Sequence, residues 1–168
     1  MTCWDLHSNR ITAPMLSTMF GQMQNAFMRL GWIVSDITQE ELEYRGPNGD
    51  LNAIATLLWH IPCADAGWLY LARGQEIPDE YTEEGPDGNL PVITGATAQE
   101  LLDRYRLILD EWERYLMTQT DADLHRPIQH APEATATLRW ALWHVAEHNI
   151  GHQNQMVWLK KWVRQGKA

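Results

Sequence analysis

The stretch from Thr137 to Trp162 constrains the fold of this chain more than any other part of the sequence. At about 100° per residue, its apolar side chains fall within roughly 60° of one line along a helix. This apolar stripe consists of Leu138, Ala141, Leu142, Val145, Met156, Leu159 and Val163. The stretch is therefore predicted to be a long amphipathic helix whose stripe faces a protein core.

Three histidines follow one another at four-residue spacing in this helix, at positions 144, 148 and 152. His152 lies about 20° and His148 about 60° from the centre of the stripe, whereas His144 lies about 100° away. Burying an imidazole without a partner costs on the order of 1 to 3 kcal/mol. A divalent metal is a natural partner, since neutral imidazole is the commonest nitrogen ligand. His148 and His152 are thus candidate metal ligands, with hydrogen-bonded core histidines or a solvent-facing pair as the alternative.

The same residues contain a competing motif. His144, Glu147 and His148 spell HxxEH, the inverted zinc-protease signature, in which the glutamate acts as general base. Glu147, however, lies about 160° from the stripe that His148 and His152 share. Helix geometry therefore argues against the protease interpretation.

Composition limits the classes of protein to which the chain can belong. With 168 residues, 45% of them hydrophobic, it is long enough for one domain with a substantial core, and we predict a single domain over residues 1–168. The net charge of −9 comes from 22 acidic and 13 basic residues. Such a chain repels phosphate backbones and anionic membranes, so we expect neither nucleic acid nor membrane as a partner.

Location and redox state are indicated by equally simple features. The first ten residues lack a basic-then-apolar signal pattern, and no apolar run approaches about 18 residues. Cys3 and Cys63 form neither a CxxC motif nor a disulfide framework. We therefore expect a cytoplasmic protein in a reducing compartment.

Two further helices are predicted before the middle of the chain. Pro14 suits a first helical turn, and apolar residues then recur at three- and four-residue steps as far as Val34. After a polar, turn-rich segment, a second helix is predicted from Leu51 to Arg73, with Asp50 as its N-cap and Gly74 as its stop. The apolar stripe of this second helix consists of Ala53, Ile54, Leu57, Ile61, Ala64, Trp68 and Leu71.

The second helix carries another histidine that leans inward. His60 lies about 60° from the centre of its stripe, so it is either a hydrogen-bonded core residue or a ligand. Cys63, one turn later, is either a small core residue or a further ligand. Asp65 is either an acceptor for an imidazole N–H or an ordinary solvated carboxylate.

The rest of the chain completes an all-α pattern. Residues 74–95 are predicted to form a long loop, because they are rich in Pro, Gly and acidic residues. Thr97 and Glu100 then form a capping box ahead of a third helix with a stripe from Leu101 to Leu116. His7, His125 and His130 are predicted to lie at the surface. Four amphipathic helices without an alternating strand pattern predict a four-helix bundle with long connecting loops.

This layout resembles the DinB/YfiT-like superfamily of metal-dependent four-helix proteins. The segment NAIATLLWHI, which ends near His60, is similar to that family's helix-two histidine segment. The segment LRWALWHVAEHNIGHQNQM is similar to its helix-four pattern ending in HxxxHxxQ, although Gln153-Asn154 stands where the family often has Arg-Gly. By matching positions, the resemblance implies that His60, His148 and His152 are the metal ligands.

The resemblance also implies a range of activities. Three neutral histidines leave a divalent cation, with Zn²⁺ or Ni²⁺ expected, its full charge and an open coordination position, as in catalytic sites. Characterised branches of the family use a low-molecular-weight thiol in transfer or isomerisation, or carry out metal-assisted hydrolysis. We expect a small-molecule substrate and favour the thiol version. The alternative is a non-catalytic metal-binding or small-ligand-binding stress-response protein, since no inward carboxylate is an obvious general base.

Nine tryptophans against two phenylalanines are unusual. Several apolar residues lie on the side of the last helix that faces away from the core stripe, namely Trp140, Trp143, Ile150, Trp158 and Trp162. A helix that is apolar on both sides is usually covered twice. We therefore predict a homodimer, or close packing of this side against the long loop.

Overall fold

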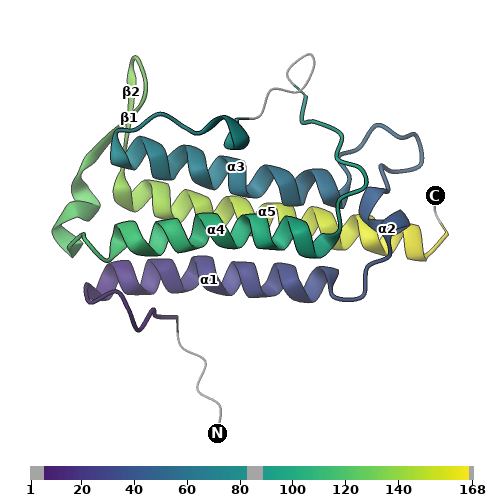
Figure 1. The fold of residues 1–168 in the computed structure, drawn as a ribbon, viewed down its shortest axis with the longest axis horizontal. Coiled ribbons are helices and arrows are strands. Elements are labelled where there is room, and N and C mark those ends of the chain that lie inside the picture. The colour runs from purple at the N-terminus through teal and green to yellow at the C-terminus, as the bar shows by residue number, and fades with distance from the viewer. Residues whose placement is uncertain (1–5, 83–88, 167–168) are drawn as a thin grey trace, which may run out of the picture.

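The computed structural model describes residues 6–82 and 89–166, and within them four long helices lie side by side (Figure 1). The predicted all-α four-helix bundle is confirmed. The long helices are α1 (Pro14–Val34), α3 (Ile54–Arg73), α4 (Ala98–Leu116) and α5 (Leu138–Arg164). The Thr97 and Glu100 capping box at the start of α4 is present, and Gly74 ends α3 in the left-handed conformation, both as predicted.

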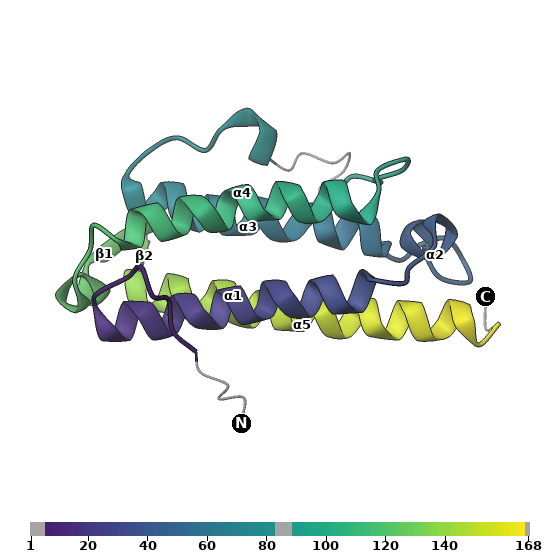
Figure 2. The same ribbon diagram turned by 60° about the horizontal axis from the view of Figure 1, so that its bottom comes forward.

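The helices form two layers, with α1 beside α5 in one and α3 beside α4 in the other (Figure 2). Within each layer the two helices are parallel, and α3 runs antiparallel to α5. The connection from α3 to α4 must therefore cross the length of the bundle, and its described part includes the short 3-10 helix η1 (Asp79–Tyr81). Consecutive helices thus do not simply alternate up and down.

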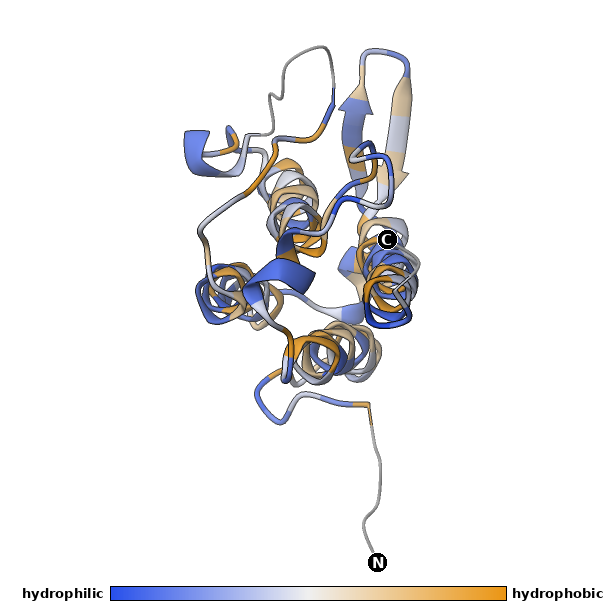
Figure 3. Ribbon diagram, turned by 90° about the vertical axis from the view of Figure 1, so that its right-hand side faces the viewer, coloured by the Kyte–Doolittle hydropathy of each residue, from blue (hydrophilic) through white to orange (hydrophobic). Residues whose placement is uncertain are grey.

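Viewed end-on, the four helices surround a common interior (Figure 3). Apolar side chains from all four fill it, and each fully buried one contributes roughly 1.5 to 3 kcal/mol relative to exposure. The largest fully buried side chains include Trp112, Tyr105, Phe20, Leu16, Met23, Leu30, Leu57 and Ile61. No helix of the described residues combines the length and apolarity that crossing a membrane requires.

The predicted start of the second helix was wrong. The helix α3 begins at Ile54, after Ala53 as an N-cap without a side-chain hydrogen bond, and not at Leu51 after Asp50. The reason is a loop closed by its own backbone, since the N–H of Leu51 donates to the carbonyl oxygen of Arg45 at 3.0 Å. Leu51 is thereby used to close the loop and does not open the helix.

A short helix, α2 (Gln39–Glu43), lies in the segment that was expected to be only a polar connection. Its first turn is held by a capping box between Thr38 and Glu41. Arg164 near the end of α5 binds Glu41 at 2.5 Å and Asp36 at 3.0 Å. Hydrogen bonds from Arg164 and from the backbone of Thr38 lower the pKa of Glu41 to about 2, so these ion pairs tie α2 to the C-terminal end of α5.

The connection between α4 and α5 also contains more structure than predicted. After the 3-10 helix η3 (Asp121–His125), strands β1 (Pro127–Ala131) and β2 (Ala134–Thr137) form an antiparallel hairpin with a register shift between Gln129 and Ala131. Most of the hairpin is exposed, and Ile128 is its buried anchor. One buried residue in so short a strand leaves no alternating pattern to recognise.

Candidate metal centre

Two antiparallel helices bring together the three histidines that the sequence analysis singled out. His60 lies near the middle of α3, and His148 and His152 lie on successive turns of α5. Four-residue spacing keeps the two α5 imidazoles on one side of that helix. Because α3 packs directly against α5, this side faces the helix that carries His60.

The imidazole nitrogens converge on one point. The Nε2 atom of His148 lies 3.0 Å from Nε2 of His60 and 3.0 Å from Nε2 of His152. One nitrogen from each ring lies within 4.8 Å of those of the other two. Tetrahedral Zn²⁺ with bonds of about 2.0 to 2.1 Å separates its nitrogen ligands by about 3.3 Å. The three nitrogens are therefore close enough to hold a single metal ion.

Burial keeps the central ring neutral. All three imidazoles are partly buried. Burial is the main cause that lowers the pKa of His148 from its ordinary value of 6.5 to about 3. The neighbouring imidazoles of His152, His60 and His144 lower this pKa further, in that order. A neutral imidazole is the form that coordinates a metal, so protons do not compete for this nitrogen near neutral pH.

The hydrogen bond at His152 fits a cation bound through Nε2. Such binding leaves the proton of each ring on Nδ1. For His152 this proton has an acceptor, because Oε1 of Gln155 lies 3.0 Å from Nδ1. This bond orients the ring and favours the coordinating tautomer. The Nδ1 atom of His148 is buried without a hydrogen-bond partner among the described residues.

The residues of the inverted protease motif lie elsewhere. The carboxylate of Glu147 is 3.7 Å from Nδ1 of His144, and its side chain is 57% exposed. The ring of His144 stacks on Trp140, with centroids 4.7 Å apart and planes 16° from parallel. In the described chain, the group of nitrogens within metal-binding reach contains neither His144 nor a carboxylate.

Asp65 is neither an acceptor for an imidazole N–H nor a solvated carboxylate. It is fully buried, so the solvated-carboxylate alternative was wrong, and its partners are not imidazoles. The hydroxyl of Tyr105 donates to Oδ2 of Asp65 at 2.8 Å, and the amide of Asn149 donates to the same oxygen at 3.3 Å. Burial raises the pKa of Asp65 to about 7 against these two hydrogen bonds. Three helices are thus joined by a polar cluster in the core.

Cys63 is a core residue. It is 4% exposed, and its Sγ lies 3.4 Å from the carbonyl oxygen of Trp59 and 3.2 Å from the guanidinium of Arg104. Cys3 lies outside the described residues. His7, His125 and His130 are exposed, as predicted.

Two polar core residues of α5 were not anticipated. Asn149 and Gln153 are almost completely buried, and the amide of Gln153 donates to the backbone carbonyl of Ala26 on α1 at 2.9 Å. A signal was present, because Asn149 lies only about 40° from the centre of the apolar stripe. A polar residue so placed needs a buried partner.

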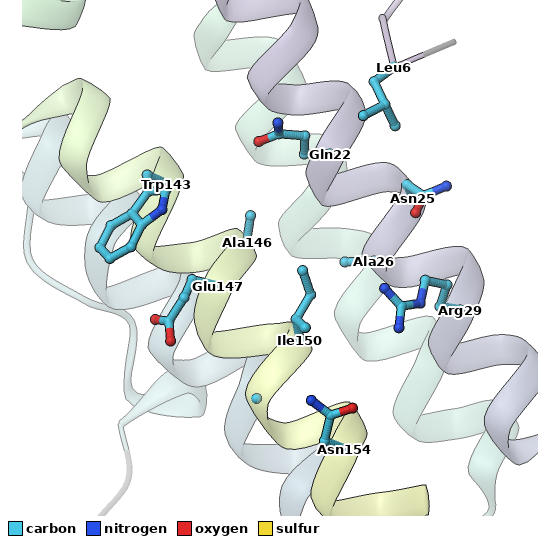
Figure 4. Close-up of a pocket in the computed structure, with 11 residues that line it drawn as sticks. Leu6, Gln22, Asn25, Ala26, Arg29, Trp143, Ala146, Glu147, Ile150 and Asn154 are labelled. Carbon is cyan, nitrogen blue, oxygen red and sulfur yellow. The ribbon is translucent and has the colours of Figure 1, made fainter. Parts of the chain in front are cut away.

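A groove of about 600 Å³ lies between α1 and α5 (Figure 4). Its floor includes the small side chains of Ala26 and Ala146, and Arg29, Asn154 and Glu147 stand at its sides. Among the described residues that line it, none is a histidine. This groove is therefore separate from the candidate metal centre.

Comparison with known proteins places the chain among relatives of similar length. The uncharacterized protein YkkA of Bacillus subtilis (strain 168) is 33% identical over 170 residues, covering 98% of this chain and 97% of that protein. A conserved protein from Enterococcus faecalis has a similar crystal structure, with a TM-score of 0.70, 16% identity, and coverage of 88% of this chain and 95% of that one.

A DinB-like protein from Bacillus cereus ATCC 10987 is similar to a comparable extent, with a TM-score of 0.63, 20% identity, and coverage of 85% of this chain and 91% of that one. At these sequence identities the two structures show similarity of fold alone. The sequence profile of the DinB superfamily matches residues 22–156, which include all of α3 and α4, parts of α1 and α5, and all three histidines of the triad. The chain belongs to the DinB superfamily.

Proposed function

We propose that this protein is a metal-dependent enzyme in which His60, His148 and His152 hold a divalent cation, Zn²⁺ or Ni²⁺, beside a small-molecule substrate. The observation that carries the proposal is the convergence of three Nε2 atoms at distances suited to one ion. Imidazole ligands suit both metals. The partial burial of the rings leaves the site accessible from the surface.

The reaction that suits this site best is S-transfer or isomerisation with a low-molecular-weight thiol, with hydrolysis as the close alternative. Three neutral ligands leave the cation its full charge, and the cation then lowers the pKa of a bound thiol or water. His148 remains neutral in its buried position, and Gln155 holds the ring of His152. Dependence on such a thiol implies a cytoplasmic location, where these thiols are kept reduced.

A specific observation favours a second candidate, a non-catalytic metal-binding or small-ligand-binding protein. The carboxylates of Glu147 and Asp65 are engaged elsewhere, since Glu147 pairs with His144 and Asp65 accepts hydrogen bonds from Tyr105 and Asn149. A hydrolase ordinarily needs a general base within hydrogen-bond reach of its water. A reaction with a thiol depends less on a general base than hydrolysis does, because a thiol ionises closer to neutral pH than water does.

We expect the metal-loaded protein to accelerate the reaction of at least one of bacillithiol, mycothiol and glutathione with a chlorinated aromatic electrophile. Loss of the rate in a chelator and in His152→Ala, with recovery on adding metal to the wild type only, would tie turnover to the triad. The measurement is the release of chloride and of the coloured thioether. Tight metal binding without turnover across the panel would support the binding protein instead.

The predicted homodimer stays a prediction with a direct test. Trp140, Trp143, Ile150, Trp158 and Trp162 are between 36% and 57% exposed, so the described residues of one chain leave the second apolar side of α5 partly uncovered. We expect sedimentation velocity to give twice the chain mass of 19.4 kDa. Buried interface cores exclude charge, so Ile150→Arg is expected to weaken the dimer at least tenfold.

The control for the dimer test is Leu107→Arg, which places the same charge on another exposed apolar position, on α4. This variant is expected to remain dimeric. A wild-type protein that sediments as a monomer at all concentrations would contradict the dimer.

A further inference from the structure

An aromatic cluster lies next to the triad along the same seam between α3 and α5. Trp68 follows His60 by eight residues on α3, and Trp140 precedes His148 by eight residues on α5. Because the two helices are antiparallel, both tryptophans lie toward the same end of the bundle from the histidines, at about 12 Å along the helix axis. The two indoles meet there, with ring centroids 4.9 Å apart.

Ring contacts connect this cluster to the triad without interruption. His144 is the link, since its ring lies 5.8 Å from that of His148 and 4.7 Å from that of Trp140. Trp68 also contacts His144, at 5.6 Å. A molecule anchored at the triad and extended along the seam would therefore pass over a row of aromatic faces.

The two tryptophans differ in exposure. Trp68 is only 8% exposed, and its contact with His130 at 4.7 Å helps to pack the hairpin onto the bundle. Trp140 is 40% exposed, although His144 covers part of one face through a nearly parallel stack. Packing against the hairpin explains why the Trp68 side chain is buried, but much of the Trp140 side chain remains available to a ligand.

A hollow of about 360 Å³ adjoins the exposed indole. This volume falls within the range of small-ligand pockets and is large enough for one or two aromatic rings. The hairpin forms most of its wall, with small or weakly polar side chains that leave room beside the indole. Its lining residues are Pro127, His130, Ala134, Thr135, Ala136, Thr137 and Trp140.

We propose that Trp140 and the hairpin form a subsite for a planar aromatic or heteroaromatic group of the substrate, whose reactive end lies at the triad. This proposal rests on the proposed function for the position of the reactive end. Stacking on an indole strengthens binding beyond what the burial of area contributes, by a factor of about 3 to 10. The site therefore selects substrates with a flat ring roughly 10 Å from the group that reacts, because the ring of Trp140 is reached from that of His148 by two ring contacts of 5.8 and 4.7 Å.

The first test uses metal-free protein and a neutral ligand without a metal-binding group, phenylbutyramide. Nuclear magnetic resonance is expected to show a shift of the indole Nε1–H signal of Trp140, identified by its loss in Trp140→Leu. Cyclohexylbutyramide, which is as apolar but not planar, is expected to shift this signal much less. No shift at Trp140 with the phenyl compound would overturn the subsite, whatever the triad binds.

The second test adds the anchor, with Zn²⁺-loaded protein and hydroxamates that bind the metal. Phenylbutyrohydroxamate is expected to bind about 3- to 10-fold more tightly than cyclohexylbutyrohydroxamate, in line with the worth of an aromatic stack. Trp140→Leu should abolish this preference, whereas Trp158→Leu, a change at an exposed indole elsewhere on α5, should retain it. Equal affinities in the wild type, or a preference that survives in Trp140→Leu, would overturn the subsite.

The two proposals fail in distinguishable ways. If acetohydroxamate shows no zinc-dependent binding, the proposed metal function fails, and the metal-free titration alone decides on the aromatic subsite. If acetohydroxamate binds but the phenyl group adds nothing, the metal site stands and the subsite is overturned.

Discussion

His148→Ala is expected to weaken Zn²⁺ binding by two to three orders of magnitude. Its Nε2 is the central atom of the triad, 3.0 Å from Nε2 of both His60 and His152. Four-ligand zinc sites bind with apparent free energies of about 10 to 16 kcal/mol, or roughly 2.5 to 4 kcal/mol per ligand. Loss of one ligand thus corresponds to a factor of about 10² to 10³ in affinity. Competition with a chromophoric chelator measures it.

The matched control is His144→Ala, which removes an imidazole one turn earlier on the same helix. Its ring stacks on Trp140 and lies outside the group of nitrogens within metal-binding reach. We expect its affinity for Zn²⁺ to remain within about threefold of the wild type, while His60→Ala and His152→Ala fall as His148→Ala does. Loss of metal in His144→Ala together with retention in His152→Ala would contradict the triad and favour the HxxEH motif. Circular dichroism of the metal-free variants separates lost ligands from lost folding.

Asp65→Asn is expected to remove a pH dependence of stability of about 4 kcal/mol. Burial raises the pKa of Asp65 from 3.8 to about 7 in the folded protein. Between these values the folded state holds a proton that the unfolded state has released, so the free energy of unfolding falls as pH rises from about 4 to about 7. A shift of about three units corresponds to about 4 kcal/mol, and above pH 7 the loss is complete.

Denaturant unfolding of metal-free protein at several pH values measures this effect as the difference between variant and wild type. The free energy of unfolding of Asp65→Asn minus that of the wild type should increase from pH 4 to pH 7 and then level off. An amide oxygen can still accept the hydrogen bonds from Tyr105 and Asn149. The matched control is Asp103→Asn, which removes an exposed carboxylate from α4. A flat difference for Asp65→Asn would show that its carboxylate is charged in the core.

Local rules predicted the long helices because their signals are repeated many times. In α5 the apolar stripe recurs over more than six turns, and in α4 the capping box of Thr97 and Glu100 marks the first turn. Short elements lack such repetition. The five residues of α2 were missed although Thr38 and Glu41 carry the same capping signal, and the hairpin has only Ile128 as a buried anchor.

The start of α3 shows why helix boundaries are harder to predict than helices. Asp50 is a suitable N-cap by residue type, but the backbone of Leu51 bonds to Arg45 across a loop. The environment of the Asp65 side chain was equally hard to predict, since its hydrogen-bond partners come from α4 and α5, which are distant in the sequence.

The sequence by itself determined that this chain forms amphipathic helices and that His148 and His152 share one side of the last of them, because a helix repeats every 3.6 residues. Tertiary structure alone decided that His60 meets them, since this requires α3 to lie antiparallel against α5 at one axial position. It also decided that Asp65 is buried and that Trp68 and Trp140 lie beside the triad. Helical periodicity sets the direction of a side chain, whereas the packing of whole helices sets what it faces.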